Sequence, residues 1–198
     1  MSTDQVKILI IETAKRNGAP PLQALAQAKA ESNFDQSAIS PAGAIGVFQL
    51  MPGTAADLGV DPYNLQQNID GGTRYIRQCN NWFPGRLDLA LSAYNWGIGN
   101  TYRMVWTSAG QPSSTLKPLQ SVWPSTSVVM QSVPNETRDY IQRVTGYMTE
   151  LVNDPVYLAS ESGGIEPGGG GVDISNSDIQ LIAGVVIFGM LAWVLLRR

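Results

Sequence analysis

The 198-residue chain contains no histidine and a single cysteine, Cys79. Without histidine, the sequence excludes the Ser-His-Asp triad, the Cys-His pair and zinc sites of the H-E-x-x-H type. A lone cysteine excludes an intrachain disulfide and a cysteine zinc cluster. We therefore expect no metal and no cofactor, and carboxylates are the expected proton-transfer groups.

Charge is also scarce. Charged residues make up 15% of the chain, the formal net charge is -3, and no run of basic residues is longer than a pair, such as the terminal Arg197-Arg198. Nucleic-acid binding requires a basic surface, so we expect no nucleic-acid partner. The N-terminus lacks a basic segment before its short apolar stretch at residues 6–11, so it does not resemble a secretory signal.

Helical periodicity and turn residues predict a mainly helical fold. A first helix, capped by Thr3 or Asp4, ends at Gly18, and a second runs from about Pro21 to Ser32. The segment from Asn33 to Gly46 is a predicted loop. Further helices are expected near residues 48–58, 66–83, 87–95 and 136–151. Residues 108–134 are rich in Ser, Pro, Gln and Thr and predict an irregular loop, either functional or a variable surface excursion.

The C-terminal part of the sequence predicts a membrane anchor. We expect a catalytic domain at residues 1–158, a Gly-rich flexible linker at 159–178 and a transmembrane helix at 179–196. The alternative for the last segment is a buried core helix. The flanking Arg197-Arg198 pair favours a cytoplasmic C-terminal end, with the catalytic domain on the opposite side of the membrane.

Glu31 is placed in the last turn of the second predicted helix. The negative end of the helix dipole disfavours its ionised form, and burial against Phe34, Ile45 or Phe48 would act in the same direction. A carboxyl group that stays protonated near neutral pH is suited to protonate a glycosidic oxygen. The alternative interpretation is a solvated surface residue.

The sequence around Glu31 and farther along the chain contains a series of motifs: ESNF at 31–34, SPAGAIGVFQLMPGTA at 40–55, NIDGGTRY at 68–75, AYNWG at 93–97 and ETRDYI at 136–141. In this order, the motifs resemble those of the soluble lytic transglycosylase family. The resemblance implies a lysozyme-like fold of the goose type and a substrate, the glycan strand of peptidoglycan. It also implies that Glu31 is the single catalytic acid and base, and that the muramic acid's own 6-hydroxyl attacks C1 to give a 1,6-anhydro product.

The same resemblance implies supporting roles for other motif residues. Ser32 would position Glu31, while Gln49 and Asn95 would hydrogen-bond to the sugars. Tyr94 and Tyr140 would line the cleft, with Tyr140 close enough to influence the acid. Two departures from the family pattern, Val47-Phe48 in place of Leu-Met and Trp96 in place of alanine, place bulky side chains beside the expected cleft; Phe48 is therefore a candidate substrate-binding residue. Asp35, Asp57 and Asp61 are expected to be structural or surface groups.

Two other functions remain open from the sequence. One is a hydrolytic muramidase similar to goose-type lysozyme, in which water attacks instead of the 6-hydroxyl. The other is a glycan-binding or structural component without activity. The predicted anchor suggests a protein of a bacteriophage virion membrane or of a bacterial cell envelope.

Overall fold

The structure is a computed structural model that describes residues 1–110 and 123–162 of the chain. These residues belong to one unit that runs from Met1 to Ile165. Most of the expected linker and the whole expected membrane segment at 179–196 lie outside the described residues. None of the helices within the described ranges is both long and apolar enough to cross a bilayer.

Helices dominate the described part of the chain, which confirms the expected mainly helical fold. No strand occurs there, apart from two isolated antiparallel bridges, Ile39–Ile45 and Ile45–Leu50. The helices are α1 (Thr3–Asn17), α2 (Pro21–Ser32), α3 (Pro52–Leu58), α4 (Leu65–Trp82), α5 (Leu87–Trp96), α6 (Ile98–Ser108), α7 (Thr126–Ser132), α8 (Asn135–Leu151) and α9 (Pro155–Glu161).

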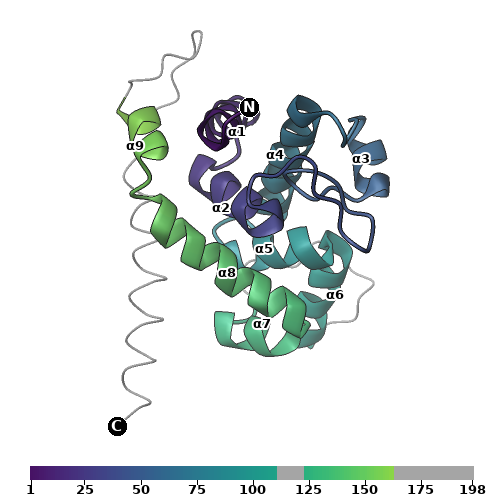
Figure 1. Ribbon diagram of the computed structural model, residues 1–198. Coiled ribbons are helices and arrows are strands. Elements are labelled where there is room, and N and C mark those ends of the chain that lie inside the picture. The colour runs from purple at the N-terminus through teal and green to yellow at the C-terminus, as the bar shows by residue number, and fades with distance from the viewer. Residues whose placement is uncertain (111–122, 163–198) are drawn as a thin grey trace. The chain divides into compact units, whose positions relative to one another are not determined.

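α5 is the central helix of the fold (Figure 1). It contacts α4, α6, α7 and α8, while α2 packs between α1 and α8. Four apolar residues of α5 are 0% exposed, namely Leu89, Ala90, Leu91 and Ala93. Such complete burial is typical of a helix that is surrounded by other helices. The packed core therefore fixes the C-terminal end of α5, where Tyr94 and Asn95 lie.

The first helix is capped one residue earlier than expected. The Ser2 hydroxyl accepts a hydrogen bond from the Gln5 amide, and the Gln5 side chain accepts one from the Ser2 amide. This reciprocal pair needs a glutamine or glutamate three residues after the cap, a condition that Ser2 meets and that Thr3 and Asp4 do not.

Other boundaries differ as well. The helix expected from Phe48 begins only at Pro52, because Ile45 and Leu50 exchange backbone hydrogen bonds of 3.0 Å and Gln49 has a φ of 45°. α7 lies inside the segment expected to be irregular, and α6 and α9 were not anticipated.

Candidate active site

Glu31 is the second-last residue of α2, directly before a sharp reversal of the chain. Asn33 and Phe34 both have positive φ, 54° and 68°, a conformation that non-glycine residues seldom adopt. The Asn33 amide donates to the carbonyls of the last turn, and Phe34 is only 8% exposed. Burial of the Phe34 ring therefore stabilises a turn that ends the helix directly after Glu31 and Ser32.

The carboxyl group of Glu31 has a strongly perturbed pKa. Burial raises this pKa to about 7, and the negative charge of Glu136 acts in the same direction. The hydrogen bond from Tyr140 and the positive charge of Arg143 oppose the increase. The expectation of a raised pKa is confirmed. A carboxyl group with such a pKa can both donate and accept a proton near neutral pH.

Two stacked tyrosines lie beside Glu31. The rings of Tyr94 and Tyr140 are nearly parallel, with planes 5° apart and centroids 6.4 Å apart. The Tyr140 hydroxyl accepts a hydrogen bond of 2.9 Å from the Gln27 amide and is hydrogen-bonded to Glu31. Burial, followed by the charge of Glu31, raises the pKa of both phenols well above the usual value, so both remain neutral near pH 7.

The loop between α2 and α3 is fastened at both sides. On the α2 side, the Ser32 hydroxyl donates to the Val47 carbonyl at 3.0 Å. On the α4 side, Asn68 binds three backbone groups: its amide nitrogen donates to the carbonyls of Ile45 and Pro62 at 2.8 and 2.9 Å, and its oxygen accepts from the Phe48 amide at 2.9 Å. Ser32 thus fastens the loop to the end of α2, directly after Glu31, while its expected role in positioning the acid itself stays a prediction.

Glycine permits the close approach of the loop to α4. A Cβ atom at Gly72 would overlap the Phe48 ring, and one at Gly46 would overlap the Asn68 amide. Gly46 also has a φ of 78°, which disfavours any other residue there. Both glycines are therefore required by contacts that hold the loop in place.

A pocket of about 240 Å³ lies beside the tyrosine pair. It brings together the expected residues Gln49, Tyr94 and Asn95, and a mixture of aromatic and amide groups suits a sugar ligand. Glu31 does not line the pocket itself; Tyr94 connects the two through its stack with Tyr140. The complete lining is Gln49, Leu50, Met51, Thr54, Tyr75, Tyr94, Asn95, Trp96 and Gly97.

Both amide side chains in the pocket are held by neighbours. The Asn95 side-chain oxygen accepts a hydrogen bond of 2.8 Å from the Thr137 hydroxyl, so its amide nitrogen is left to donate to a ligand. The Gln49 amide nitrogen donates to the carbonyls of Ala38 and Gly46, at 3.1 and 2.9 Å. Gln49 therefore presents its carbonyl oxygen, an acceptor, whereas Asn95 presents a donor.

Phe48 is not where the sequence analysis expected it. Its side chain is 0% exposed and lies against Gly72 in the core, so it cannot touch a ligand in the pocket. The contribution of Phe48 to the site is its backbone carbonyl, which accepts a hydrogen bond of 2.9 Å from the Tyr94 hydroxyl. Tyr140, at 1% exposure, is likewise a buried partner of Glu31 rather than an open wall of the cleft.

Several residues of the site were missed. Tyr75 and Trp96 both line the pocket. Tyr75 belongs to the NIDGGTRY motif but was given no role, and Trp96 was noted only as a departure from the family pattern. Gln27 and Thr137, which hold Tyr140 and Asn95, gave no separate signal because their partners lie on other helices.

The neighbouring carboxylates do not form a matched pair with Glu31. Asp35 is exposed and accepts hydrogen bonds from Ser37, whose side chain and backbone lower its pKa. Glu136 is exposed on α8 and acts on Glu31 through its charge. The described residues contain no cluster of three or more potential metal ligands.

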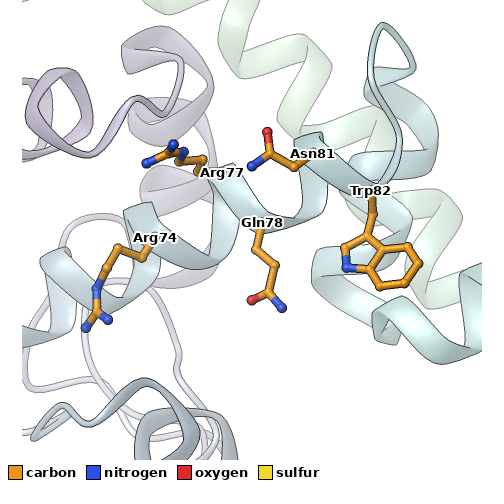
Figure 2. Close-up of a pocket in the computed structure, with 5 residues that line it drawn as sticks. All are labelled: Arg74, Arg77, Gln78, Asn81 and Trp82. Atoms are coloured by element: carbon orange, nitrogen blue, oxygen red, sulfur yellow. The ribbon is translucent and has the colours of Figure 1, made fainter.

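A second, larger hollow of about 420 Å³ lies along α4 (Figure 2). Its lining comes from successive turns of that helix and consists of Arg74, Arg77, Gln78, Asn81 and Trp82. This lining includes no carboxylate, so the hollow lacks an acid for glycoside chemistry. Arg74 is paired with Asp70 at 2.9 Å, and Arg77 donates to the Asn17 carbonyl.

Comparison with known proteins identifies the family to which the chain belongs. Residues 8–116, more than half of the chain, match the model of the transglycosylase SLT domain. The chain is 29% identical over 140 residues to the soluble lytic murein transglycosylase of Escherichia coli K12, covering 65% of this chain and 20% of that protein. It is 26% identical over 153 residues to the membrane-bound lytic murein transglycosylase D of the same organism, covering 74% and 31%.

Solved structures agree with the sequence matches. An inactive mutant of the lytic transglycosylase Slt from Pseudomonas aeruginosa has a TM-score of 0.55 and 25% identity, with 80% of this chain and 24% of that chain covered. The 70 kDa soluble lytic transglycosylase of Escherichia coli has a TM-score of 0.57 and 27% identity, with 74% and 25% covered. The chain thus spans at most about a third of these relatives' length. By its family match, its helical architecture and the placement of Glu31, the chain belongs to the SLT transglycosylase domain family.

Proposed function

We propose that this chain is a peptidoglycan lytic transglycosylase in which Glu31 is the single acid and base. The observation that carries the proposal is the environment of Glu31: a carboxyl group with a pKa of about 7, next to a pocket lined by amides and aromatic rings. The relatives are lytic murein transglycosylases by name, which supports the same class of substrate.

The proposed reaction cleaves the β-1,4 bond between N-acetylmuramic acid and N-acetylglucosamine. Protonated Glu31 gives its proton to the bridging oxygen as the C1–O bond breaks. The Glu31 carboxylate then takes the proton of the muramic acid 6-hydroxyl, and O6 bonds to C1. The proton count closes without water, and the product carries a 1,6-anhydro ring.

The pocket would hold the sugars in this scheme. Asn95 offers a donor and Gln49 an acceptor, which match the oxygen and nitrogen of an acetamido group. Tyr75, Tyr94 and Trp96 offer aromatic surface for the apolar faces of sugar rings. Ser32 and Tyr140 act on Glu31 and its loop rather than on the substrate.

Hydrolysis is the second candidate, and Glu136 is the observation that favours it. Glu136 lies close enough to affect the pKa of Glu31, so it could activate a water molecule on the substrate. The variant Glu136→Gln separates the two reactions, because only the hydrolytic route requires a second carboxylate.

The test is mass spectrometry of the products released from purified peptidoglycan by the whole chain. Glu31→Gln removes the proton-transfer group, and Asp35→Asn is the matched control, because it neutralises an exposed carboxylate four residues away. We expect 1,6-anhydro products from the wild type and from Asp35→Asn, and none from Glu31→Gln. Reducing-end products that disappear in Glu136→Gln would establish hydrolysis. Release that persists in Glu31→Gln would overturn the assignment of the acid.

We further propose, from the sequence alone, that residues 179–196 attach the chain to a membrane, in a bacterial envelope or a virion. Flotation of the full chain with lipid vesicles tests this attachment, and a chain that stays in the soluble fraction would refute it. Localisation in purified virions or in host membranes distinguishes the two settings.

A further inference from the structure

A continuous chain of side-chain hydrogen bonds runs through the core to Glu31. Asn80 on α4 donates to Gln23 at 3.0 Å, Gln23 donates to Gln27 at 2.9 Å, and Gln27 donates to the Tyr140 hydroxyl at 2.9 Å. Tyr140 is in turn hydrogen-bonded to Glu31. Gln23 and Gln27 are only 3% and 0% exposed. Burying two glutamines inside an alanine-rich helix costs folding free energy unless their amide groups are hydrogen-bonded. The series of hydrogen bonds from Asn80 to Tyr140 supplies partners for both.

All the hydrogen bonds in this series run in one direction, from donor to acceptor, and Asn80 sets that direction. The Asn80 amide nitrogen also donates to the Ile76 carbonyl at 3.0 Å. A backbone carbonyl can only accept, so the Asn80 nitrogen, rather than its oxygen, must face both Ile76 and Gln23. Each following amide is then forced to turn its nitrogen toward the next residue.

The last step determines the hydroxyl proton of Tyr140. Because Gln27 donates to the phenol oxygen, the phenol proton is free to point at Glu31. If the chain ran in the opposite direction, the Gln27 oxygen would take that proton and Glu31 would lose its donor. Hydrogen bonds arranged head to tail also polarise one another, which strengthens the final donor.

We propose that Asn80, Gln23 and Gln27 are positioning residues that fix the Tyr140 hydroxyl as a donor to Glu31 and so set the pH at which the acid works. The inference rests on the proposed role of Glu31 for its functional meaning. The Asn80 amide would affect the Glu31 carboxyl group in this way whatever reaction the site performs.

Apart from Tyr140, at which the hydrogen-bond chain ends, three other groups act on Glu31. Glu136 and Arg143 act on it from α8, and Tyr94 interacts with it from α5. A change at Asn80 leaves these three in place. Any movement of the Glu31 titration caused by Asn80 must therefore pass through the amide chain or through a long-range charge.

The experiment is an NMR titration of the Glu31 side-chain carboxyl in the full chain. Asn80→Asp keeps the size of the side chain but replaces the donor with an acceptor, which reverses the preferred direction of the chain. We expect the midpoint of the Glu31 titration to rise by about one pH unit, the amount expected for losing a hydrogen bond to a charged group. The alkaline limb of the kcat profile should move by the same amount.

The matched control is Gln78→Glu on the same helix (Figure 2). It adds an equal charge two residues away, and Gln78 lines the outer hollow instead of the amide chain. If both variants move the titration equally, or Asn80→Asp does not move it, the proposal is wrong.

A second variant guards against misfolding of Asn80→Asp. The double change Gln23→Met and Gln27→Met replaces both buried amides with apolar side chains of similar shape, which limits the cost to stability. It should raise the midpoint by less than Asn80→Asp does, because the Tyr140 hydroxyl keeps its proton for Glu31 and loses only the polarising donor behind it. In a Tyr140→Phe background the double change should leave the midpoint unchanged, since the hydrogen-bond chain acts through that hydroxyl. A wild type that titrates as expected but releases no glycan product would defeat the proposed function and leave this inference standing.

Discussion

Tyr94 lies between the pocket and the acid: its ring lines the pocket and stacks on Tyr140 with the two planes 5° apart. The Tyr94 hydroxyl donates to the Phe48 carbonyl at 2.9 Å and so also holds the loop. One side chain therefore combines two tasks, which can be separated by substitution.

Tyr94→Ala removes the ring and admits water toward Glu31. Because burial is the main cause of the raised pKa, we expect the pKa of Glu31 to fall from about 7 toward its ordinary value. The pH of maximal activity should fall with it. Tyr94→Phe keeps the ring and removes only the loop hydrogen bond, so its pH profile should stay near that of the wild type. Profiles of kcat against pH compare the two, and equal shifts in both would contradict the role of the ring.

Glu31→Gln should stabilise the protein in alkaline solution. The pKa of Glu31 is about 7 in the folded chain, above the ordinary value of 4.5, so the folded state binds the proton more tightly. This contribution is fully present below pH 4.5 and is lost as the pH rises through 7. Glutamine does not ionise, so Glu31→Gln should be more stable than the wild type by about 1–3 kcal/mol at pH 8 and by much less at pH 5. Thermal unfolding at both pH values measures the difference, and a gain that does not depend on pH would count against the raised pKa.

Gly72→Ala tests the contact between α4 and the loop. The added methyl group would overlap the Phe48 ring, which is itself 0% exposed and cannot move into solvent. We expect a loss of about 1–3 kcal/mol in the free energy of unfolding. Gly53→Ala on α3 is the control, because a Cβ atom there meets nothing within 4 Å. Urea unfolding of both variants gives the comparison, and similar stabilities would show that the loop is not held here.

Thr137→Val tests the orientation of Asn95. Valine has nearly the shape of threonine but cannot donate the 2.8 Å hydrogen bond that turns the Asn95 nitrogen toward the pocket. We expect KM to rise several-fold, by the typical net value of one hydrogen bond, with a smaller effect on kcat. Steady-state kinetics on soluble glycan fragments provides the measurement. A drop in kcat at constant KM would place Asn95 in the chemical step instead.

The sequence predicted the parts of this site that depend on short segments. Glu31 at the end of α2, and its raised pKa, follow from Pro21, the apolar helix and the loop that begins at Asn33. The resemblance supplied Gln49, Tyr94, Asn95 and Tyr140 by motif, and the structure places each at the pocket or beside Glu31.

The remaining features depend on which side of a segment faces a neighbour. Phe48 and Gln49 are adjacent in a loop without periodicity, so only the packing against Gly72 decides that Phe48 points inward. The amide chain through Gln23 and Gln27 is likewise formed by α2, α4 and α8 together. No pattern within α2 distinguishes these glutamines from surface residues.

The attachment of the loop by Asn68 also limits how the site can diverge. One side chain contacts Ile45, Phe48 and Pro62 simultaneously, so the number of residues between these contacts cannot change without breaking at least one hydrogen bond. We therefore expect insertions and deletions between Ile45 and Pro62 to destabilise the loop that carries Gln49. Single substitutions at pocket positions such as Gln49 and Trp96 leave these three bonds intact, so they are the changes that can alter substrate preference without loosening the loop.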